Sequence, residues 1–187
     1  IISENKDGVC YLTINRPKQL NALNLATISE LSNAIIKADR DQSIRCIILT
    51  GAEKKAFVAG ADIKEFASFD VAAGESLSRK GQELLFDVLE NIGTPTIAAI
   101  NGFALGGGLE LAMASHIRIA SDNAKMGLPE VSLGVIPGYG GTQRLASLVG
   151  RGKAIEMIAT AGMLSANEAK DWGLVNHVCP PEELIFT

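Results

Sequence analysis

Two glutamates near the middle of the chain lie in apolar surroundings. Glu110 is set among leucine, alanine and methionine in LGGGLELAMA, and Glu130 lies between Pro129 and Val131. A carboxylate in an apolar setting costs free energy unless it has a partner or a chemical use. A facing pair of such groups is a candidate for general acid/base work, although each glutamate alone is more often a helix-dipole or loop-surface residue.

A run of glycines, Gly106 to Gly108, precedes Glu110 at the expected start of a helix. Glycine lets a backbone approach a ligand closely, and the first N–H groups of a helix have no internal partner. A second glycine turn, Ala59 to Ala61, could aim another N–H at the same point, and two converging donors define an oxyanion hole. Close packing of a helix on a strand is the alternative explanation. The run is no dinucleotide fingerprint, because the third glycine of G-x-G-x-x-G would fall at Leu111, and no GxxxxGK[ST] loop occurs.

Composition favours one globular domain spanning residues 1–187. The chain is 47% hydrophobic and 20% charged, with a formal net charge of −4 that gives no support to a nucleic-acid role. Its cysteines, Cys10, Cys46 and Cys179, lack the spacing of a metal site and are expected to be reduced. No apolar run approaches the roughly 20 residues of a membrane span. The chain opens in Ile-Ile without an initiator Met or a leader, so a trimmed or mature fragment in a soluble, reducing compartment is expected.

Strands and helices are expected to alternate along the chain. Short apolar or alternating runs predict strands at 9–15, 44–50, 96–100, 116–120, 125–128 and 175–179. Helical spacing predicts a helix after Asn24, with Ser32, Asn33 and Lys37 toward water, and a second over about 77–92 with Leu84 on its apolar face. Further helices are expected at 109–114, through 145–148, at 153–159 and at 166–172. Asp62 and Glu65 have capping-box spacing, which predicts a helix starting near Ile63.

Several ordered motifs resemble one family over essentially the whole chain. NRPKQLNAL, AFVAGADIKEF, IAAINGFALGGGLELA and MGLPEVSLGVIPGYGGTQRL are similar to segments of the crotonase (enoyl-CoA hydratase/isomerase) superfamily. The resemblance implies an α/β fold, a crotonase-like spiral of repeated ββα units. Chains of that family usually continue into a helical C-terminal region, and because this sequence stops at Thr187, that region is expected to be absent from it.

The resemblance also implies the chemistry and the residues that perform it. In that family two backbone N–H groups hold the enolate oxygen of an acyl-CoA thioester, and by motif they fall on Ala61 and Gly107. The two glutamates of its hydratases fall on Glu110 and Glu130, and the substrate-binding turn falls on Ala61, Asp62, Ile63 and Lys64. The expected activity is therefore that of an enoyl-CoA hydratase, a lyase that adds water to trans-2-enoyl-CoA to give 3-hydroxyacyl-CoA in fatty-acid or related metabolism.

Partners and rival functions follow from the same resemblance. No metal and no cofactor are expected, since coenzyme A is part of the substrate, and the family's common assembly is a homotrimer or a hexamer that is a dimer of trimers. Arg16, Lys54 or Lys55 could meet the CoA phosphates, and His116 and His177 are expected to be structural. An enoyl-CoA isomerase, a hydrolase or a decarboxylase remains open, as does a non-catalytic RNA- or acyl-CoA-binding member. The cytoplasm is the expected location, or the mitochondrial matrix if a transit peptide was removed.

Overall fold

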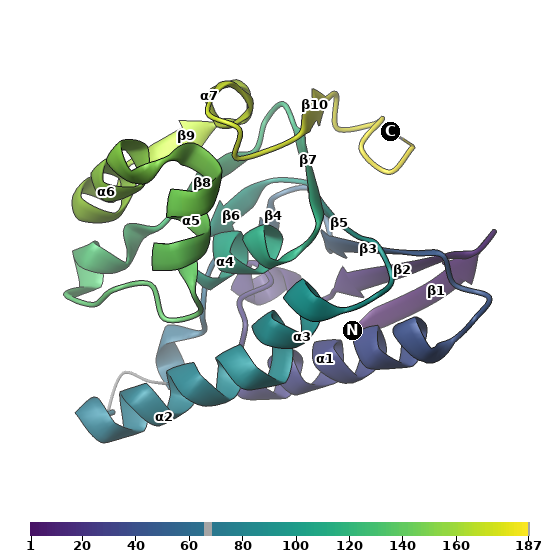
Figure 1. The fold of residues 1–187 in the computed structure, drawn as a ribbon, viewed down its shortest axis with the longest axis horizontal. Helices are drawn as coiled ribbons and strands as arrows, with labels where there is room; N and C mark the ends of the chain where they lie inside the picture. The colour runs from purple at the N-terminus through teal and green to yellow at the C-terminus, as the bar shows by residue number, and fades with distance from the viewer. Residues whose placement is uncertain (66–68, 187) are drawn as a thin grey trace.

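Two β-sheets form the framework of the molecule (Figure 1). The computed structural model describes residues 1–65 and 69–186. The larger sheet has the strand order β1-β2-β3-β5-β7-β10, and the smaller has the order β4-β6-β8-β9. The larger sheet consists of β1 (Ile2–Lys6), β2 (Val9–Ile14), β3 (Cys46–Gly51), β5 (Thr96–Ile100), β7 (Ile117–Ser121) and β10 (His177–Cys179). The smaller consists of β4 (Ala56–Val58), β6 (Phe103–Leu105), β8 (Lys125–Gly127) and β9 (Met163–Ser165).

Successive strand pairs divide themselves between the two sheets. From β3 onward, β3 and β4, β5 and β6, and β7 and β8 each give one strand to the larger sheet and one to the smaller. The ladders are parallel except for β1 with β2 and β8 with β9. Helical segments follow these pairs, so the prediction of an α/β fold built from repeated ββα units is confirmed.

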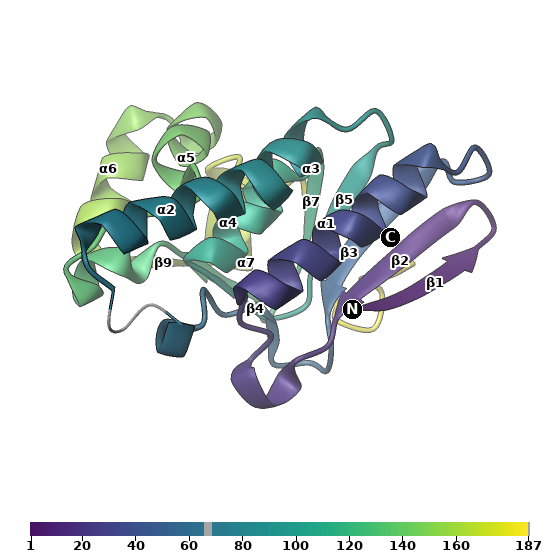
Figure 2. The ribbon, with the colours of Figure 1, turned by 90° about the horizontal axis from the view of Figure 1, so that it is seen from below.

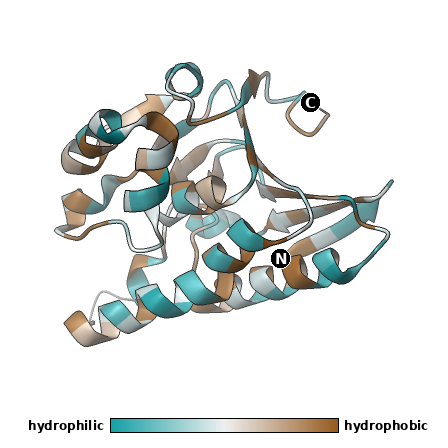
Figure 3. Ribbon diagram, viewed as in Figure 1, coloured by the Kyte–Doolittle hydropathy of each residue, from teal (hydrophilic) through white to brown (hydrophobic). Residues whose placement is uncertain are grey.

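Seven α-helices are described, of which α4 is buried inside the fold. They are α1 (Leu25–Arg40), α2 (Val71–Gly81), α3 (Asp87–Asn91), α4 (Gly107–Ala114), α5 (Gly141–Val149), α6 (Arg151–Thr160) and α7 (Ala166–Asp171). Short 3-10 segments are η1 (Pro17–Gln19), η2 (Ile63–Glu65) and η4 (Pro129–Leu133). Figure 2 shows α1 beside the continuous helical stretch that runs from α2 to α3, which it contacts. Hydrophilic and hydrophobic residues alternate along both, as expected of amphipathic helices (Figure 3).

The first helix begins where the sequence predicts. The Asn24 side chain accepts a hydrogen bond from the N–H of Thr27 at 2.9 Å, which satisfies one of the free donors at the helix start. The expectation that Ser32 faces water is wrong. Its side chain is buried and donates a hydrogen bond to the carbonyl of Leu84, so a polar residue pins α1 to its neighbour.

The second long helix begins six residues earlier than the expected 77. Asp70 caps it by accepting from the N–H of Ala73 at 2.8 Å, and the helix then passes through a π-helical turn, η3 (Gln82–Phe86), before α3. An extra residue in a π turn shifts the faces of the helix. Leu84 is accordingly 42% exposed and not on the apolar face, contrary to expectation, while Leu85 and Phe86 are buried.

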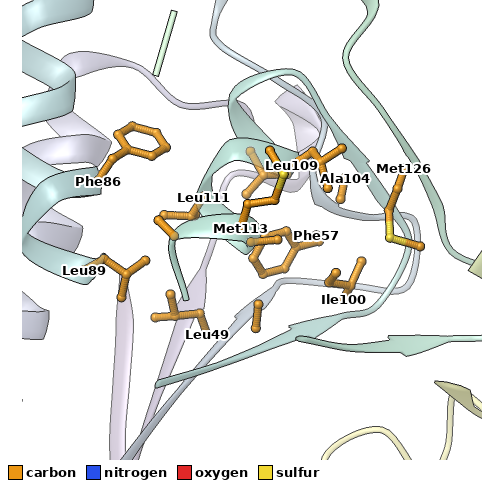
Figure 4. Packing of buried hydrophobic residues seen from close by; sticks show 14 of the residues in the cluster. Leu49, Phe57, Phe86, Leu89, Ile100, Ala104, Leu109, Leu111, Met113 and Met126 are labelled. Carbon is orange, nitrogen blue, oxygen red and sulfur yellow. The ribbon is translucent and has the colours of Figure 1, made fainter. Parts of the chain in front are cut away.

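The hydrophobic core surrounds α4, every residue of which is buried. Figure 4 shows its side chains beside residues from the strands and from the η3–α3 segment: Leu109, Leu111, Met113, Phe57, Ile100, Met126, Phe86 and Leu89. All three cysteines are free thiols, as expected, and burial raises the pKa of the Cys10 and Cys46 thiols. His116 accepts from the N–H of Thr96 at 3.0 Å, which agrees with its expected structural role.

Within residues 1–65 and 69–186, no helix has the length and hydropathy needed to cross a bilayer. The same residues contain no group of three or more His, Cys, Asp or Glu side chains arranged to hold a metal ion.

Candidate active site

Three neighbouring strand ends bring the predicted site residues to one edge of the smaller sheet. Strands β4, β6 and β8 run parallel to one another, so their carboxyl ends share an edge. The turn ending at Ala61 follows β4, the glycine run and α4 follow β6, and Glu130 follows β8. A hydrogen bond of 2.9 Å from the N–H of Gly106 to the carbonyl of Gly127 continues the ladder to that edge. Ligands of α/β proteins commonly bind where parallel strands end.

The two predicted oxyanion donors are neighbours at this edge. Gly107 is the first residue of α4, and its N–H has no acceptor among the described residues, nor has that of Ala61. A methyl group on Gly107 would lie 3.7 Å from the nitrogen of Ala61. Leu23 holds the turn in place, since its N–H donates to Gly60 and its carbonyl accepts from Asp62. The oxyanion role of both residues stays a prediction.

The glycine run is needed for packing as well as for access. A methyl group on Gly108 would lie 1.9 Å from the carbonyl oxygen of Val58, so α4 approaches β4 more closely than any side chain allows. Gly106 has a φ of +52°, which L-residues rarely adopt, and a methyl group there would lie 3.0 Å from Oε1 of Glu130. Close packing therefore explains Gly108 and the positive φ explains Gly106, whereas access of a ligand to Gly107 stays a prediction.

Glu110 is almost completely buried, with 1% of its surface exposed. Its Oε1 accepts hydrogen bonds from the N–H groups of Tyr139 and Gly141, both at 2.8 Å. Burial raises its pKa from 4.5 to about 7; the two backbone hydrogen bonds oppose the shift, the charge of Glu130 adds to it and that of Arg144 opposes it. A carboxyl group with a pKa near neutrality suits proton transfer at neutral pH.

The segment that holds Glu110 was not identified from the sequence. GVIPGYGGTQR leads into the helix expected through 145–148, and its residues Tyr139 and Gly141 provide the two N–H groups that donate to Glu110. Gly141 is the first residue of α5, so Glu110 also lies at a helix start, where negative charge is favoured. A methyl group on Gly141 would lie 2.8 Å from Oε1 of Glu110. The glycine density of this segment is the signal that could have located it.

Glu130 lies in the first turn of η4, which follows β8 at the same sheet edge as the glycine run. The residue is half-buried, and burial raises the pKa of its carboxyl group. Its Oε2 is buried without a hydrogen-bond partner in the part of the chain that the structure describes. Unpaired buried polar atoms are rare in folded proteins. A carboxyl group with one such oxygen, and with its other oxygen against Gly106, is a candidate for handling a proton or contacting a ligand.

The turn from Ala61 to Glu65 is anchored by two carboxylates. Asp62 accepts from Nη2 of Arg16 at 2.9 Å, and this bond is the main reason that the pKa of Asp62 is lowered. The predicted capping box is wrong, because the N–H of Asp62 bonds to Leu23, while Glu65 accepts from the N–H of Leu25, at 2.9 Å to Oε2. Glu65 therefore caps α1 across the fold. Continuation of the expected helix, including Phe66, falls outside the described residues.

The remaining predicted binding residues lie in different parts of the molecule. Ile63 and Lys64 are exposed, and Arg16 is engaged with Asp62 and with the carbonyl of Ala22. Lys54 instead lines a cavity of about 350 Å³ at the ends of β2, β3 and β5 in the larger sheet. Neither this cavity nor a second one of about 220 Å³ is lined by Glu110 or Glu130.

The arrangement supplies what enolate chemistry requires. The two acidic groups are close enough for the charge of Glu130 to raise the pKa of Glu110, and burial raises the pKa of both carboxyl groups. Beside them lie the free N–H groups of Ala61 and Gly107. Such a site can stabilise an oxyanion and move a proton at the adjacent carbon atoms.

Comparisons with known proteins agree with this chemistry. A family model described as enoyl-CoA hydratase/isomerase matches residues 4–186. The chain is 50% identical over 187 residues to the short-chain-enoyl-CoA hydratase of Clostridium acetobutylicum. That alignment covers 100% of this chain and 71% of the relative. It is 47% identical to the crotonyl-CoA hydratase of Syntrophomonas wolfei, over 99% of this chain and 71% of that one. The crystal structure of enoyl-CoA hydratase from Bacillus anthracis aligns with a TM-score of 0.94 at 42% identity, covering 99% of this chain and 72% of that chain. By motif, fold and sequence identity, the chain belongs to the enoyl-CoA hydratase/isomerase family, the crotonase superfamily that its motifs predict.

Proposed function

We propose that this protein is an enoyl-CoA hydratase that adds water reversibly to short trans-2-enoyl-CoA thioesters. The observation that carries the proposal is the pair of acids: Glu110, buried with a pKa of about 7, and Glu130, with an unpaired buried oxygen, at the edge that also presents the N–H groups of Ala61 and Gly107. The names of its relatives in Clostridium acetobutylicum and Syntrophomonas wolfei support the choice of hydration and of a short acyl chain.

In the proposed reaction, the thioester oxygen accepts hydrogen bonds from Ala61 and Gly107. Oε1 of Glu110 is already held by two N–H groups, so Oε2 is the oxygen left to orient and deprotonate a water molecule. The water oxygen bonds to C3, the C2–C3 π electrons move toward the thioester, and negative charge develops on its oxygen. Glu130 then delivers a proton to C2. The product is 3-hydroxyacyl-CoA, and the pair of acids still holds one proton.

The expected contributions are large enough to measure one by one. Positioned proton transfer accelerates a reaction by about 10²- to 10⁴-fold. One oxyanion donor is worth roughly 3 to 4 kcal/mol. Neither the rate factor nor the oxyanion term includes the free energy of binding the CoA portion of the substrate.

The test is the loss of the conjugated enoyl-thioester absorbance of crotonyl-CoA, measured with Glu110→Gln and Glu130→Gln. We expect kcat to fall by about 10²- to 10⁴-fold in each variant, because glutamine keeps the shape but cannot exchange a proton. Glu156→Gln is the matched control, since Glu156 is exposed and pairs only with Lys153 on α6. Activity that survives either active-site change would reject the assignment.

The oxyanion donors need a separate test, because a backbone N–H cannot be removed by changing a side chain. A methyl group on Gly107 would contact the Tyr139 ring at 3.4 Å and the nitrogen of Ala61 at 3.7 Å, both ordinary contact distances. Gly107→Ala should therefore fold normally yet crowd the position of the thioester oxygen, so that kcat/KM falls. An unchanged kcat/KM would remove Gly107 from the proposed site.

The same purified protein can be used to test the related activities and the assembly. Conversion of a 3-enoyl-CoA without hydration of crotonyl-CoA would reassign the protein to the isomerases of its family.

The proposed assembly is a homotrimer or a dimer of trimers, which light scattering on the purified protein tests directly. The proposed location is the cytoplasm, or the mitochondrial matrix if a transit peptide was removed.

A further inference from the structure

Arg144 on α5 is a buried cation next to the segment that holds Glu110. Only 8% of its surface is exposed. Its Nη2 lies 2.6 Å from Oε2 of Glu90 and 3.8 Å from Oδ1 of Asp87, both on α3, and its Nη1 donates to the carbonyl of Tyr139 at 2.7 Å. The guanidinium therefore joins α3 to the chain between α5 and η4.

The contact falls on the stretch that carries both hydrogen-bond donors of Glu110. Tyr139 accepts from Arg144 through its carbonyl and donates to Glu110 through its N–H. Gly140, which follows it, has a φ of +82°, and a methyl group there would lie 2.3 Å from Nη1 of Arg144. Gly141 then supplies the second donor. The guanidinium thus packs on the middle of the three-residue loop whose two ends hold the carboxylate.

Stability alone is a poor explanation for this arrangement. The Glu90 and Asp87 side chains are 47% and 48% exposed, and ion pairs that are open to solvent on one side typically contribute only about 0 to 1 kcal/mol to stability. The hydrogen bonding is also incomplete, because Nε of Arg144 and the nearby Oε1 of Gln82 are buried without partners in the described part of the chain. What the guanidinium does specify is the position of the Tyr139 carbonyl.

We propose that Arg144, anchored by Glu90, is a positioning residue that fixes the loop from Tyr139 to Gly141 and thereby aims the Glu110 carboxylate at the reacting water. The inference rests on the proposed hydratase function for its catalytic consequence and on geometry alone for its structural one. No atom of Arg144 needs to touch the substrate.

The positive charge has a second effect on the same carboxylate. Arg144 lowers the pKa of Glu110, against burial and against the negative charge of Glu130. Tyr139 is the other titratable group facing Glu110, and its own pKa is raised to about 12, so it stays neutral. Removing the cation is expected to raise the pKa of Glu110 and to move the acidic limb of the kcat/KM profile to higher pH.

The experiment compares Arg144→Met and Arg144→Lys with Arg118→Met in the full chain. Arg118 is an equally buried arginine that also donates to backbone carbonyls, those of Leu174 and Ser115, on β7 away from the loop. A 13C NMR titration follows the Glu110 carboxyl carbon, and steady-state kinetics follow crotonyl-CoA. The titration needs no catalysis, so it still tests the positioning role if wild type proves inactive and the proposed function fails.

The expected pattern separates positioning from bulk stability. Arg144→Met should raise the pKa of Glu110 and lower kcat by about 10- to 100-fold. A loss of this size is typical when residues that orient metal-binding side chains are replaced, and Arg144 has the same kind of indirect role. Arg144→Lys should keep the pKa near that of wild type, because the charge remains, while losing part of kcat. Arg118→Met should lower the unfolding midpoint without moving the pKa. Identical pKa values in Arg144→Met and wild type, or the same shift in Arg118→Met, would overturn the proposal.

Chemical rescue provides a second test. A cavity of about 220 Å³ adjoins the ion pair and is lined by Glu90, Met113, Gln143, Arg144, Ser147 and Leu148. Arg144→Ala would enlarge it enough to admit a free guanidinium ion beside Glu90. Guanidinium at non-denaturing millimolar concentration should restore kcat several-fold, whereas equimolar urea should not. Equal effects of both additives would count against a positioning role for the cation.

Discussion

Replacing Glu110 by glutamine should make the protein more stable at neutral pH while making it inactive. Glutamine has nearly the same shape, and its carbonyl oxygen can accept the hydrogen bonds that Tyr139 and Gly141 now give to Oε1. What it removes is the cost of keeping a carboxylate charged in a site that is 1% exposed. The gain in stability and the loss of kcat therefore come from the same group.

The magnitude follows from proton linkage. The pKa of Glu110 is about 7 in the folded protein against 4.5 in the unfolded chain. Between these values the native state binds more protons than the unfolded state, so this group's contribution is complete below about pH 4.5 and is lost as pH rises through 7. At about 1.4 kcal/mol for each pH unit, the loss amounts to roughly 3 kcal/mol.

The assay is urea unfolding of wild type and Glu110→Gln at intervals from pH 5 to pH 8. The free energy of unfolding of wild type minus that of the variant should fall by roughly 2.5 kcal/mol across the range, because part of the loss already occurs below pH 5. Subtraction cancels the other carboxyl groups, and Glu156→Gln should show no such trend, because Glu156 is exposed. Parallel pH curves for wild type and Glu110→Gln would refute the reasoning, since they would mean that Glu110 titrates normally.

Three further substitutions test the packing and capping of helices. Gly108→Ala should cost about 3 kcal/mol or more, because its methyl group would lie 1.9 Å from the carbonyl oxygen of Val58; Gly152→Ala on α6, with no atom within 4 Å, should instead stabilise by about 0.5 to 1 kcal/mol. Chemical denaturation distinguishes them, and a mild Gly108→Ala would contradict the close approach of α4 to β4. Ser165→Ala should cost about 1 kcal/mol by removing the capping box with Glu168 at the start of α7, and an unchanged unfolding midpoint would show that this cap contributes nothing.

Local signals in the sequence located the elements whose pattern is long or strongly apolar. The Asn24 cap, the β5 run and the glycine start of α4 are all read from adjacent residues, and each agrees with the structure. The failures involve distant partners. Ser32 bonds to Leu84, and Glu65 caps α1 from 40 residues away, and neither pairing leaves a mark on neighbouring sequence.

The smaller sheet was the hardest part to predict, and it carries the site. Its strands have only three residues each, too few for alternation to show, and only β8 among them was expected, at 125–128. The ββα units also escaped detection as a sequence repeat, because their first strands begin at irregular intervals, at residues 46, 96 and 117. The motifs single out Glu110 and Glu130 from the sequence, but only the parallel order of β4, β6 and β8 explains why their segments end at one edge of a sheet.

That parallel order separates the reaction geometry from substrate choice. Adjacent strands are held about 4.8 Å apart by their hydrogen bonds, so the spacing between the two acids is inherited from rigid backbone. The exposed apolar residues beyond Glu130, Leu133 and Ile136 among them, lie past the last hydrogen bond of that ladder. Under the proposed function, insertions or substitutions at these residues are expected to change substrate preference while the spacing of the two acids remains constant. The same fold can thereby vary in substrate specificity while the reaction that it catalyses stays the same.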